Sequence, residues 1–236
     1  DTFGDPLHSK PVVLNYGAGD IRIAIGTNAG VLHFFKDEGE SVEESWAFMP
    51  TEFFGNVTTL RENNSQSKVY GIDGPITSFI SDVNGNGEID SGTDRALLFF
   101  GLRRGGQSYY AMDVTDPDEP ALLWHIDNNT TGFSELGQTW SQPKVIYSQL
   151  NITAATVDDA GNEVSAQAKP VLIFGGGYDT NKDSSSGDDS LGKAIYMVDA
   201  LSGDLVWSLG GGNSNSTAFT GTDSIAAAIA SIDSDA

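Results

Sequence analysis

The chain contains no cysteine, few basic residues and no long apolar run. Without cysteine it has neither a thiolate nucleophile nor a thiolate-ligated zinc site, and an oxidising compartment is neither required nor excluded. Twelve Lys and Arg residues stand against 33 Asp and Glu residues, which gives a formal net charge of −21. Such a surface repels phosphate backbones and anionic headgroups, so we expect no binding to nucleic acid or to membrane surfaces. The same surface concentrates divalent cations.

Targeting and spanning segments are also absent from the sequence as given. No stretch approaches the roughly 18 consecutive apolar residues of a transmembrane helix, so we expect no membrane insertion. The first residues, Asp1-Thr2-Phe3, do not begin a signal peptide and are typical of an excised or mature segment.

No catalytic constellation can be assembled from the sequence. The three histidines, His8, His33 and His125, lie far apart and without metal-ligand spacing. The glycine run at 175–177 follows a strand-like segment but precedes no helix, which argues against a phosphate cradle. We therefore predict that the chain is not an enzyme.

The residues that are present predict an all-β protein. Hydrophobic residues make up 39% of the 236-residue chain, which is enough for a packed core. Short β-branched and aromatic runs, such as 76–81 and 109–113, recur between clusters of Gly, Asn and Asp, and helical periodicity is nearly absent. We interpret residues 1–236 as a single domain.

The runs repeat in a fixed order and define units of about residues 8–48, 75–126 and 138–209. Each unit has four candidate strands, and this repeat is typical of β-propeller blades, whose apolar faces are buried only by stacking on neighbouring blades. A tryptophan on the last strand of each unit is interpreted as a packing residue between blades, and an aspartate that ends the third strand is interpreted as an acceptor that closes the following turn. These residues are Trp46, Trp124, Trp207, Asp113 and Asp199.

A further unit begins but is not completed. Residues 224–231 have the pattern of a first strand, after which the sequence ends. Propellers typically need four to eight blades to close, so we predict an incomplete portion of a larger ring. Two polar insertions, 151–169 and 175–192, interrupt the third unit.

The loop from Asp82 to Asp90 carries the clearest functional signal. Oxygen-bearing side chains stand at its positions one, three, five and nine (Asp82, Asn84, Asn86 and Asp90), and Gly87 at position six allows a sharp turn. This phasing is typical of loops that wrap Ca²⁺ in oxygen ligands. The alternative is an ordinary surface turn, which is also rich in Asn, Asp and Gly.

The loop is not an EF-hand, because its position twelve is Thr93 rather than a bidentate Glu and its flanks are not helical. Asp90 must then supply the closing carboxylate, with Asp94 as a possible helper. Two carboxylates and two amides predict weak affinity, about 10⁻⁴–10⁻³ M. Second cation sites are conceivable at 233–235 and among the acids of 179–189.

Four stretches resemble PilY1-type proteins, the calcium-binding tip and biogenesis factors of bacterial type IV pili. They are Leu136-Gly-Gln-Thr-Trp-Ser-Gln-Pro143, residues 171–183 with Phe-Gly-Gly-Gly-Tyr-Asp-Thr-Asn-Lys-Asp, Gly192-Lys-Ala-Ile-Tyr-Met-Val-Asp-Ala200, and the Asp82–Asp90 loop. The resemblance runs from about Gly4 to the end and concerns the C-terminal propeller of that family. The segment from Tyr196 to Trp207 also resembles quinoprotein dehydrogenase repeats.

The resemblance implies a modified seven-bladed propeller, extracellular or on the cell surface, at a pilus tip or associated with the outer membrane. Calcium occupancy would govern pilus extension, retraction and adhesion, and the partners would be type IV pilus components and host or abiotic surface ligands. The implied Ca²⁺ ligands are Asp82, Asn84, Asn86, the Glu88 carbonyl and Asp90. Asparagine at positions three and five, where such loops often have Asp, departs from the family pattern.

Three alternatives remain at the level of sequence, and the simplest is a structural propeller with an incidental ion. An integrin-like calcium-binding surface propeller for protein–protein interaction would repeat the loop in consecutive units, whereas the first unit has only 15–20 at that place and the third has a long polar insert. A quinoprotein-type dehydrogenase would need a closed funnel with a cation beside a bound quinone.

Overall fold

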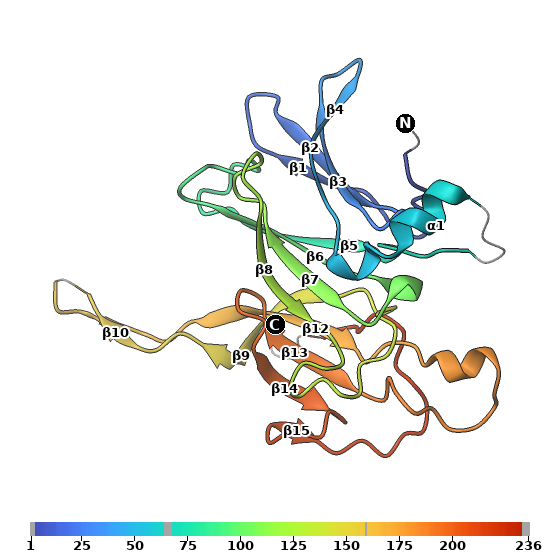
Figure 1. The fold of residues 1–236 in the computed structure, drawn as a ribbon. Helices are drawn as coiled ribbons and strands as arrows, with labels where there is room; N and C mark the ends of the chain where they lie inside the picture. Colours follow the sequence, from blue (N-terminus) through green and yellow to red (C-terminus); the bar gives the residue numbers. More distant parts are fainter. Residues whose placement is uncertain (1–2, 64–67, 159, 233–236) are drawn as a thin grey trace.

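In the computed structural model, which describes residues 3–63, 68–158 and 160–232, three antiparallel sheets follow one another along the chain (Figure 1). The first contains β1 (Val12–Asn15), β2 (Ile21–Gly26), β3 (Leu32–Asp37) and β4 (Val42–Phe48). The second contains β5 (Ile76–Ser81), β6 (Arg95–Gly101), β7 (Tyr109–Asp113) and β8 (Ala121–Ile126). The third contains β9 (Lys144–Ile152), β12 (Ala168–Gly175), β13 (Ile195–Asp199) and β14 (Leu205–Leu209), with β15 (Ser216–Thr217) added in parallel.

Within each sheet the four main strands pair in the order in which they occur along the chain. This up-and-down pairing and the stacking of one sheet on the next are those of propeller blades, so the all-β propeller-type fold is confirmed. The sheets do not close into a ring within the residues that the structure describes. The predicted strands 76–81 and 109–113 coincide with β5 and β7.

Two apolar layers join the sheets. One contains buried residues of the first and second sheets, and the other contains buried residues of the second and third. The Trp46 indole N–H donates to the Pro117 carbonyl at 2.9 Å, and the Trp124 indole N–H donates to the Ala200 carbonyl at 3.0 Å. Each tryptophan therefore ties the last strand of one sheet to the β-hairpin that joins the last two strands of the next, as predicted for a packing residue between blades.

The aspartates that end the third strands close the turns that follow them. Asp113 accepts the Thr115 N–H at 2.9 Å, and Asp199 accepts the Leu201 N–H at 2.8 Å. The prediction of a turn-closing role is confirmed for both residues. An Asp side chain that accepts the N–H two residues later stabilises such a turn locally.

A glycine at the end of the second strand of a unit allows the backbone that leads into the next unit to pass close to it. A Cβ added at Gly101 would lie 2.9 Å from the Thr139 carbonyl oxygen, just ahead of β9, and one added at Gly175 would lie 2.2 Å from the Ile225 carbonyl oxygen. The segment around Ile225 thus occupies the place at which a next unit enters.

The prediction of a strand at residues 224–231 is nevertheless wrong, because this segment forms no β-ladder. A first strand is held by the second strand of its own unit, and none follows it in the described residues. Residues of this segment bond to loops of the third unit instead: the Gly177 N–H donates to the Ile225 carbonyl at 3.0 Å, and the Ser141 hydroxyl donates to the Ala227 carbonyl at 2.8 Å.

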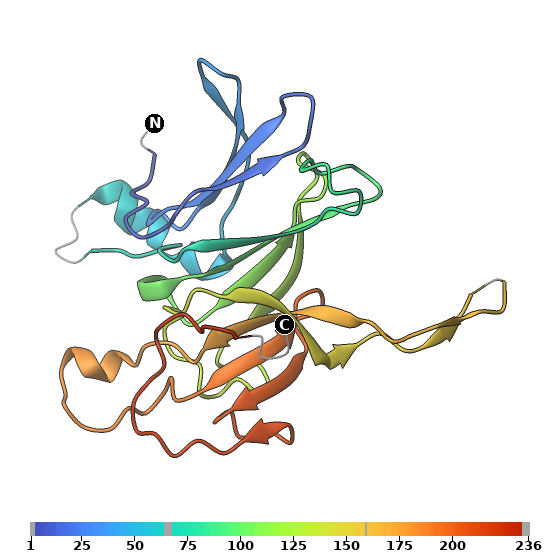
Figure 2. The ribbon, with the colours of Figure 1, turned by 180° about the vertical axis from the view of Figure 1, so that it is seen from behind.

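The segments between the main strands contain the remaining elements. Helix α1 (Asn56–Glu62), which the sequence did not predict, follows the short 3₁₀ turn Thr51–Phe53 between the first two sheets, and further 3₁₀ turns cover Arg103–Gly105 and Thr180–Asp183. The 151–169 insertion contains a ribbon of β10 (Thr156–Val157) and β11 (Glu163–Val164), which projects from the third sheet (Figures 1 and 2). In the ranges described, no helix has the length and apolar character needed to cross a bilayer.

Candidate metal centre

The candidate cation loop joins β5 to β6 and is anchored against the first sheet. Ile89 is buried in the apolar layer between the first two sheets. The Ile89 N–H donates to the Asn15 carbonyl at 2.8 Å, and the Asn15 side-chain amide donates to the Gly87 carbonyl at 3.1 Å. Because Asn15 ends β1, the loop is positioned by two sheets rather than by its own strands alone.

Asp82 organises the first half of the loop. Its carboxylate accepts the backbone N–H groups of Gly85 at 2.6 Å, Asn86 at 3.3 Å and Gly87 at 2.8 Å. Both glycines have positive φ, +72° and +79°, a conformation that side-chain-bearing residues rarely adopt. The backbone therefore curls around the Asp82 carboxylate, as a cation-binding turn requires.

Asn84 and Asn86 point toward Asp90 across the loop. Their side-chain nitrogens donate to the same Asp90 oxygen at 2.7 and 2.9 Å. Their side-chain oxygens accept the Asn86 N–H at 2.9 Å and the Glu88 N–H at 2.8 Å. The structure thus brings together the four side chains that the spacing indicated.

The residues fit a hard cation in their donor chemistry. Each amide oxygen has two lone pairs, so it can keep its backbone N–H and still coordinate an ion. The two amide NH₂ groups now supply the positive partner that Asp90 would otherwise find in a cation. Coordination of a cation would need Asp90 to exchange these amide contacts for the ion, since a carboxylate oxygen is a preferred calcium ligand.

The Glu88 side chain lies on the side of the loop that faces the first sheet. A Cβ built on Gly17 would lie 2.6 Å from a Glu88 carboxylate oxygen, so this carboxylate occupies the space beside the β1–β2 turn. The role of the Glu88 carbonyl as a ligand stays a prediction.

Asp94 braces the loop through its backbone. Its two carboxylate oxygens accept the Val83 N–H at 3.0 Å and the Asp90 N–H at 2.9 Å. These two hydrogen bonds lower the pKa of the buried Asp94 carboxyl, and the bond from the Asp90 N–H has the larger effect. Asp94 therefore helps the site by fixing the chain on both sides of Asp82 and Asp90 rather than by adding a free ligand.

Among the described residues there is no group of three or more His, Cys, Asp and Glu side chains that could hold a metal. The candidate loop rests on two carboxylates and two amides, so Ca²⁺ stays a prediction.

The acids of 179–189 do not converge on a common point. The Asp179 carboxylate accepts backbone N–H groups, Asp183 accepts from Arg104 and from the Tyr178 hydroxyl, and Asp189 forms an ion pair with Lys182 at 3.2 Å. The other conceivable second site, 233–235, lies outside the described residues.

Sequence reasoning missed a buried ionic cluster at the other end of β5. Asp73, whose side chain is fully buried, contacts the His8 ring nitrogen at 2.9 Å and accepts from Asn28 at 3.1 Å and from Arg103 at 3.2 Å. The available signal was the Asp-Gly-Pro tripeptide at 73–75, which stands where the other units have Ser-x-Pro. The cluster ties the N-terminal segment to the second sheet.

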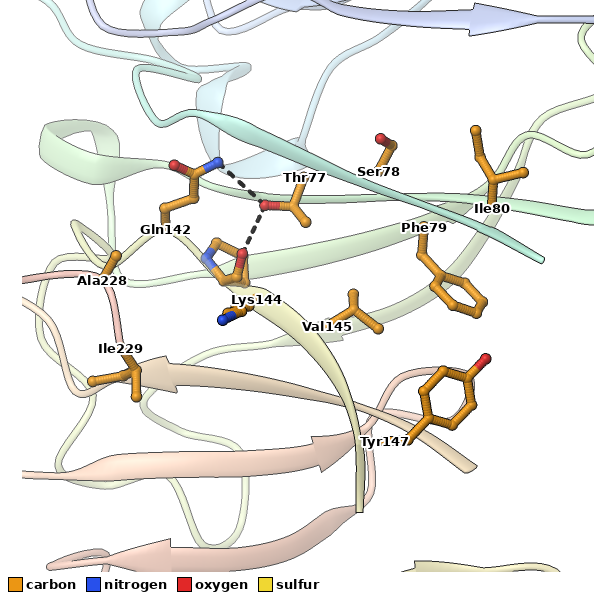
Figure 3. Close-up of a pocket in the computed structure, with 11 residues that line it drawn as sticks. Thr77, Ser78, Phe79, Ile80, Gln142, Lys144, Val145, Tyr147, Ala228 and Ile229 are labelled. Carbon is orange, nitrogen blue, oxygen red and sulfur yellow. Dashed lines mark hydrogen bonds between the residues drawn. The ribbon is translucent and has the colours of Figure 1, made fainter. Parts of the chain in front are cut away.

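Sequence reasoning also missed a cavity of about 570 Å³ between β5 and β9 (Figure 3). The rings of Phe79 and Tyr147 lie near each other at one end, with centroids 6.4 Å apart. At the other end, the Thr77 hydroxyl donates to the Pro143 carbonyl at 2.7 Å. The cavity is the space where the first strands of two neighbouring blades diverge.

The curated proteins that match this chain carry the same family name. No family model matches the chain. It is 27% identical to the type IV pilus biogenesis factor PilY1 of Pseudomonas aeruginosa strain UCBPP-PA14, in a 227-residue alignment that covers 86% of this chain. It is 30% identical to a PilY1 homologue of Xylella fastidiosa, in a 155-residue alignment that covers 64% of this chain. The matched regions span 17% and 10% of these relatives.

Among solved structures, the P. aeruginosa PilY1 C-terminal domain matches with a TM-score of 0.49 and 24% identity, over 80% of this chain and 29% of that one. The chain is homologous to PilY1-type type IV pilus biogenesis factors.

Proposed function

We propose that this chain is a Ca²⁺-binding propeller module of a type IV pilus-associated protein at the bacterial cell surface. The observation that carries the calcium assignment is the convergence of Asp82, Asn84, Asn86 and Asp90 in one anchored loop. The names of the relatives support the association with pili. Type IV pilus components, host or abiotic surfaces and the remainder of the propeller are the proposed partners.

Calcium at this loop would act on the junction between the first two sheets. The loop is attached to β1 through Asn15 and to the apolar layer through Ile89. An ion held by Asp82 and Asp90 would fix the loop against both sheets, because it neutralises two carboxylates that otherwise repel each other at close range. We propose that this stiffening is how calcium occupancy affects pilus extension, retraction and adhesion.

We also propose that the role is binding rather than catalysis. The relatives are named as biogenesis factors. If the chain were a quinoprotein-type dehydrogenase, added quinone cofactor and Ca²⁺ would create a new absorbance band, and a reducing substrate would bleach it. We expect no such band, and its appearance would replace the binding role with an enzymatic one.

Titration calorimetry with Ca²⁺ tests the proposed site. We expect the wild-type chain to bind with a Kd of about 10⁻⁴–10⁻³ M, and Mg²⁺ to bind more weakly because it demands a smaller octahedral shell. Asp90→Ala should abolish the heat, whereas Asp188→Ala, which removes an exposed acid of the β12–β13 loop, should leave it unchanged. Equal heats from wild type and Asp90→Ala would exclude the loop as the binding site.

A further inference from the structure

Asparagine is followed directly by glycine at two places in the chain, and both lie in the cation loop: Asn84-Gly85 and Asn86-Gly87. Both asparagines are exposed. Apart from the adjoining residues of the chain, no described atom lies within 4 Å of the place where a Cβ would stand on either glycine. The space beside each glycine is therefore open.

We propose that Asn84 and Asn86 are sites of spontaneous deamidation, which converts them into acidic ligands. The glycine nitrogen attacks the asparagine Cγ, and the Cγ–Nδ2 bond breaks. The side-chain nitrogen leaves as ammonia and takes with it the proton that the glycine nitrogen gives up. Water, the one co-reactant, then opens the five-membered imide to aspartate or, through the other carbonyl, to isoaspartate.

The loop geometry supports this reaction at both pairs. The N–H groups of Gly85 and Gly87 donate to Asp82 at 2.6 and 2.8 Å, so both attacking nitrogens already share their proton with a carboxylate. Glycine removes the steric barrier to ring closure, because it has no Cβ. One carboxylate therefore contacts both reacting backbone groups.

Conversion to aspartate would invert the electrostatics of the loop. The Asp90 oxygen that now accepts two amide N–H groups, from Asn84 and Asn86, would face two further carboxylates. Without a cation these charges repel one another. With Ca²⁺ they add charged ligands, and ligand charge is one of the properties that set calcium affinity. This consequence rests on the proposed function, whereas the modification itself does not.

Peptide mass mapping of the folded chain, incubated in warm and mildly alkaline buffer, tests the modification. Asn162 is the matched internal control: it lies in an exposed hairpin and donates its amide to Asp158 at 2.9 Å, but Glu163 follows it. We expect the peptide with Asn84 and Asn86 to gain the mass difference between amide and acid with time, while the Asn162 peptide does not.

The double variant Asn84→Gln/Asn86→Gln should not convert, because glutamine would need a larger ring. The proposal is overturned if the folded loop stays unconverted under conditions in which a synthetic peptide of residues 82–90 converts. It is also overturned if Asn162 converts as fast as the loop asparagines.

Calorimetry on Asn84→Asp/Asn86→Asp tests the consequence separately. We expect Ca²⁺ to bind at least about tenfold more tightly than to the freshly prepared wild-type chain, since two charged ligands are added. Equal or weaker affinity would refute the consequence. Conversion by mass with no calcium heat from either protein would leave the modification in place and remove the proposed calcium function.

Discussion

Asp179 is a single carboxylate that organises a long loop. It is 2% exposed and accepts the N–H groups of Asn181 at 2.9 Å, Ser190 at 2.5 Å and Leu191 at 3.2 Å. Burial works to raise the pKa of Asp179, but these donors outweigh it and hold the pKa at about 2. The two ends of the β12–β13 loop are thus fastened to one charged side chain.

The depressed pKa predicts a pH-dependent contribution to stability. Because the folded pKa lies below the ordinary value of 3.8, the ionised Asp179 stabilises the fold fully above that value, and the contribution is lost as the pH falls toward 2. We expect Asp179→Asn to lower the free energy of unfolding by about 2 kcal/mol at neutral pH and by less in acid. Urea unfolding at a series of pH values measures this, with Asp188→Asn as the control, and a difference that does not change with pH would contradict it.

At the scale of elements, the sequence predicted those strands whose alternating buried and exposed side chains give a recognisable pattern. The β5 and β7 boundaries were predictable because their side chains pack into apolar layers between sheets. Helix α1 was missed because none of its residues is buried, so it carries no apolar stripe. The strand expected at 224–231 failed for another reason, because pairing depends on a neighbour and not on the segment alone.

The candidate site likewise has a part that the sequence predicted and a part that it could not predict. Its four side chains were predictable because they come from one contiguous turn, in which spacing fixes direction. The support from Asn15 and the bracing by Asp94 could not be predicted, because they depend on tertiary contacts; Asn15 reaches Gly87 from another sheet.

The projecting ribbon supplies a prediction at this scale. The ribbon exposes Val157 and Val164 and contributes no residue to the buried clusters. Asp158 closes its tip by accepting the Ala160 and Asn162 N–H groups. We expect that replacing 153–166 by a short turn changes the free energy of unfolding by less than about 0.5 kcal/mol, since no packing is lost. Thermal unfolding checks this, and a large loss of stability would show that the ribbon packs on the body of the molecule.

For the whole molecule, stability is expected to arise from contacts between neighbouring sheets. Each sheet buries its faces only against the next, so the array resembles a row of nearest-neighbour interactions. The tryptophans that end the first two units contribute to these contacts. Trp46 and Trp124 each reach a carbonyl of the following sheet, whereas the Trp207 indole N–H reaches the Thr217 hydroxyl within its own sheet, at 3.3 Å.

The three tryptophans therefore predict a graded series. Trp124→Phe removes the N–H and leaves the Ala200 carbonyl without its partner, so we expect a loss of about 1–2 kcal/mol in the free energy of unfolding. Trp46→Phe should cost a similar amount through Pro117. Trp207→Phe should change stability by less than about 0.5 kcal/mol, because it joins no pair of sheets. Equal losses for all three in urea unfolding would mean that each tryptophan stabilises its own sheet, and the repeated contact between sheets would then not be what holds the array together.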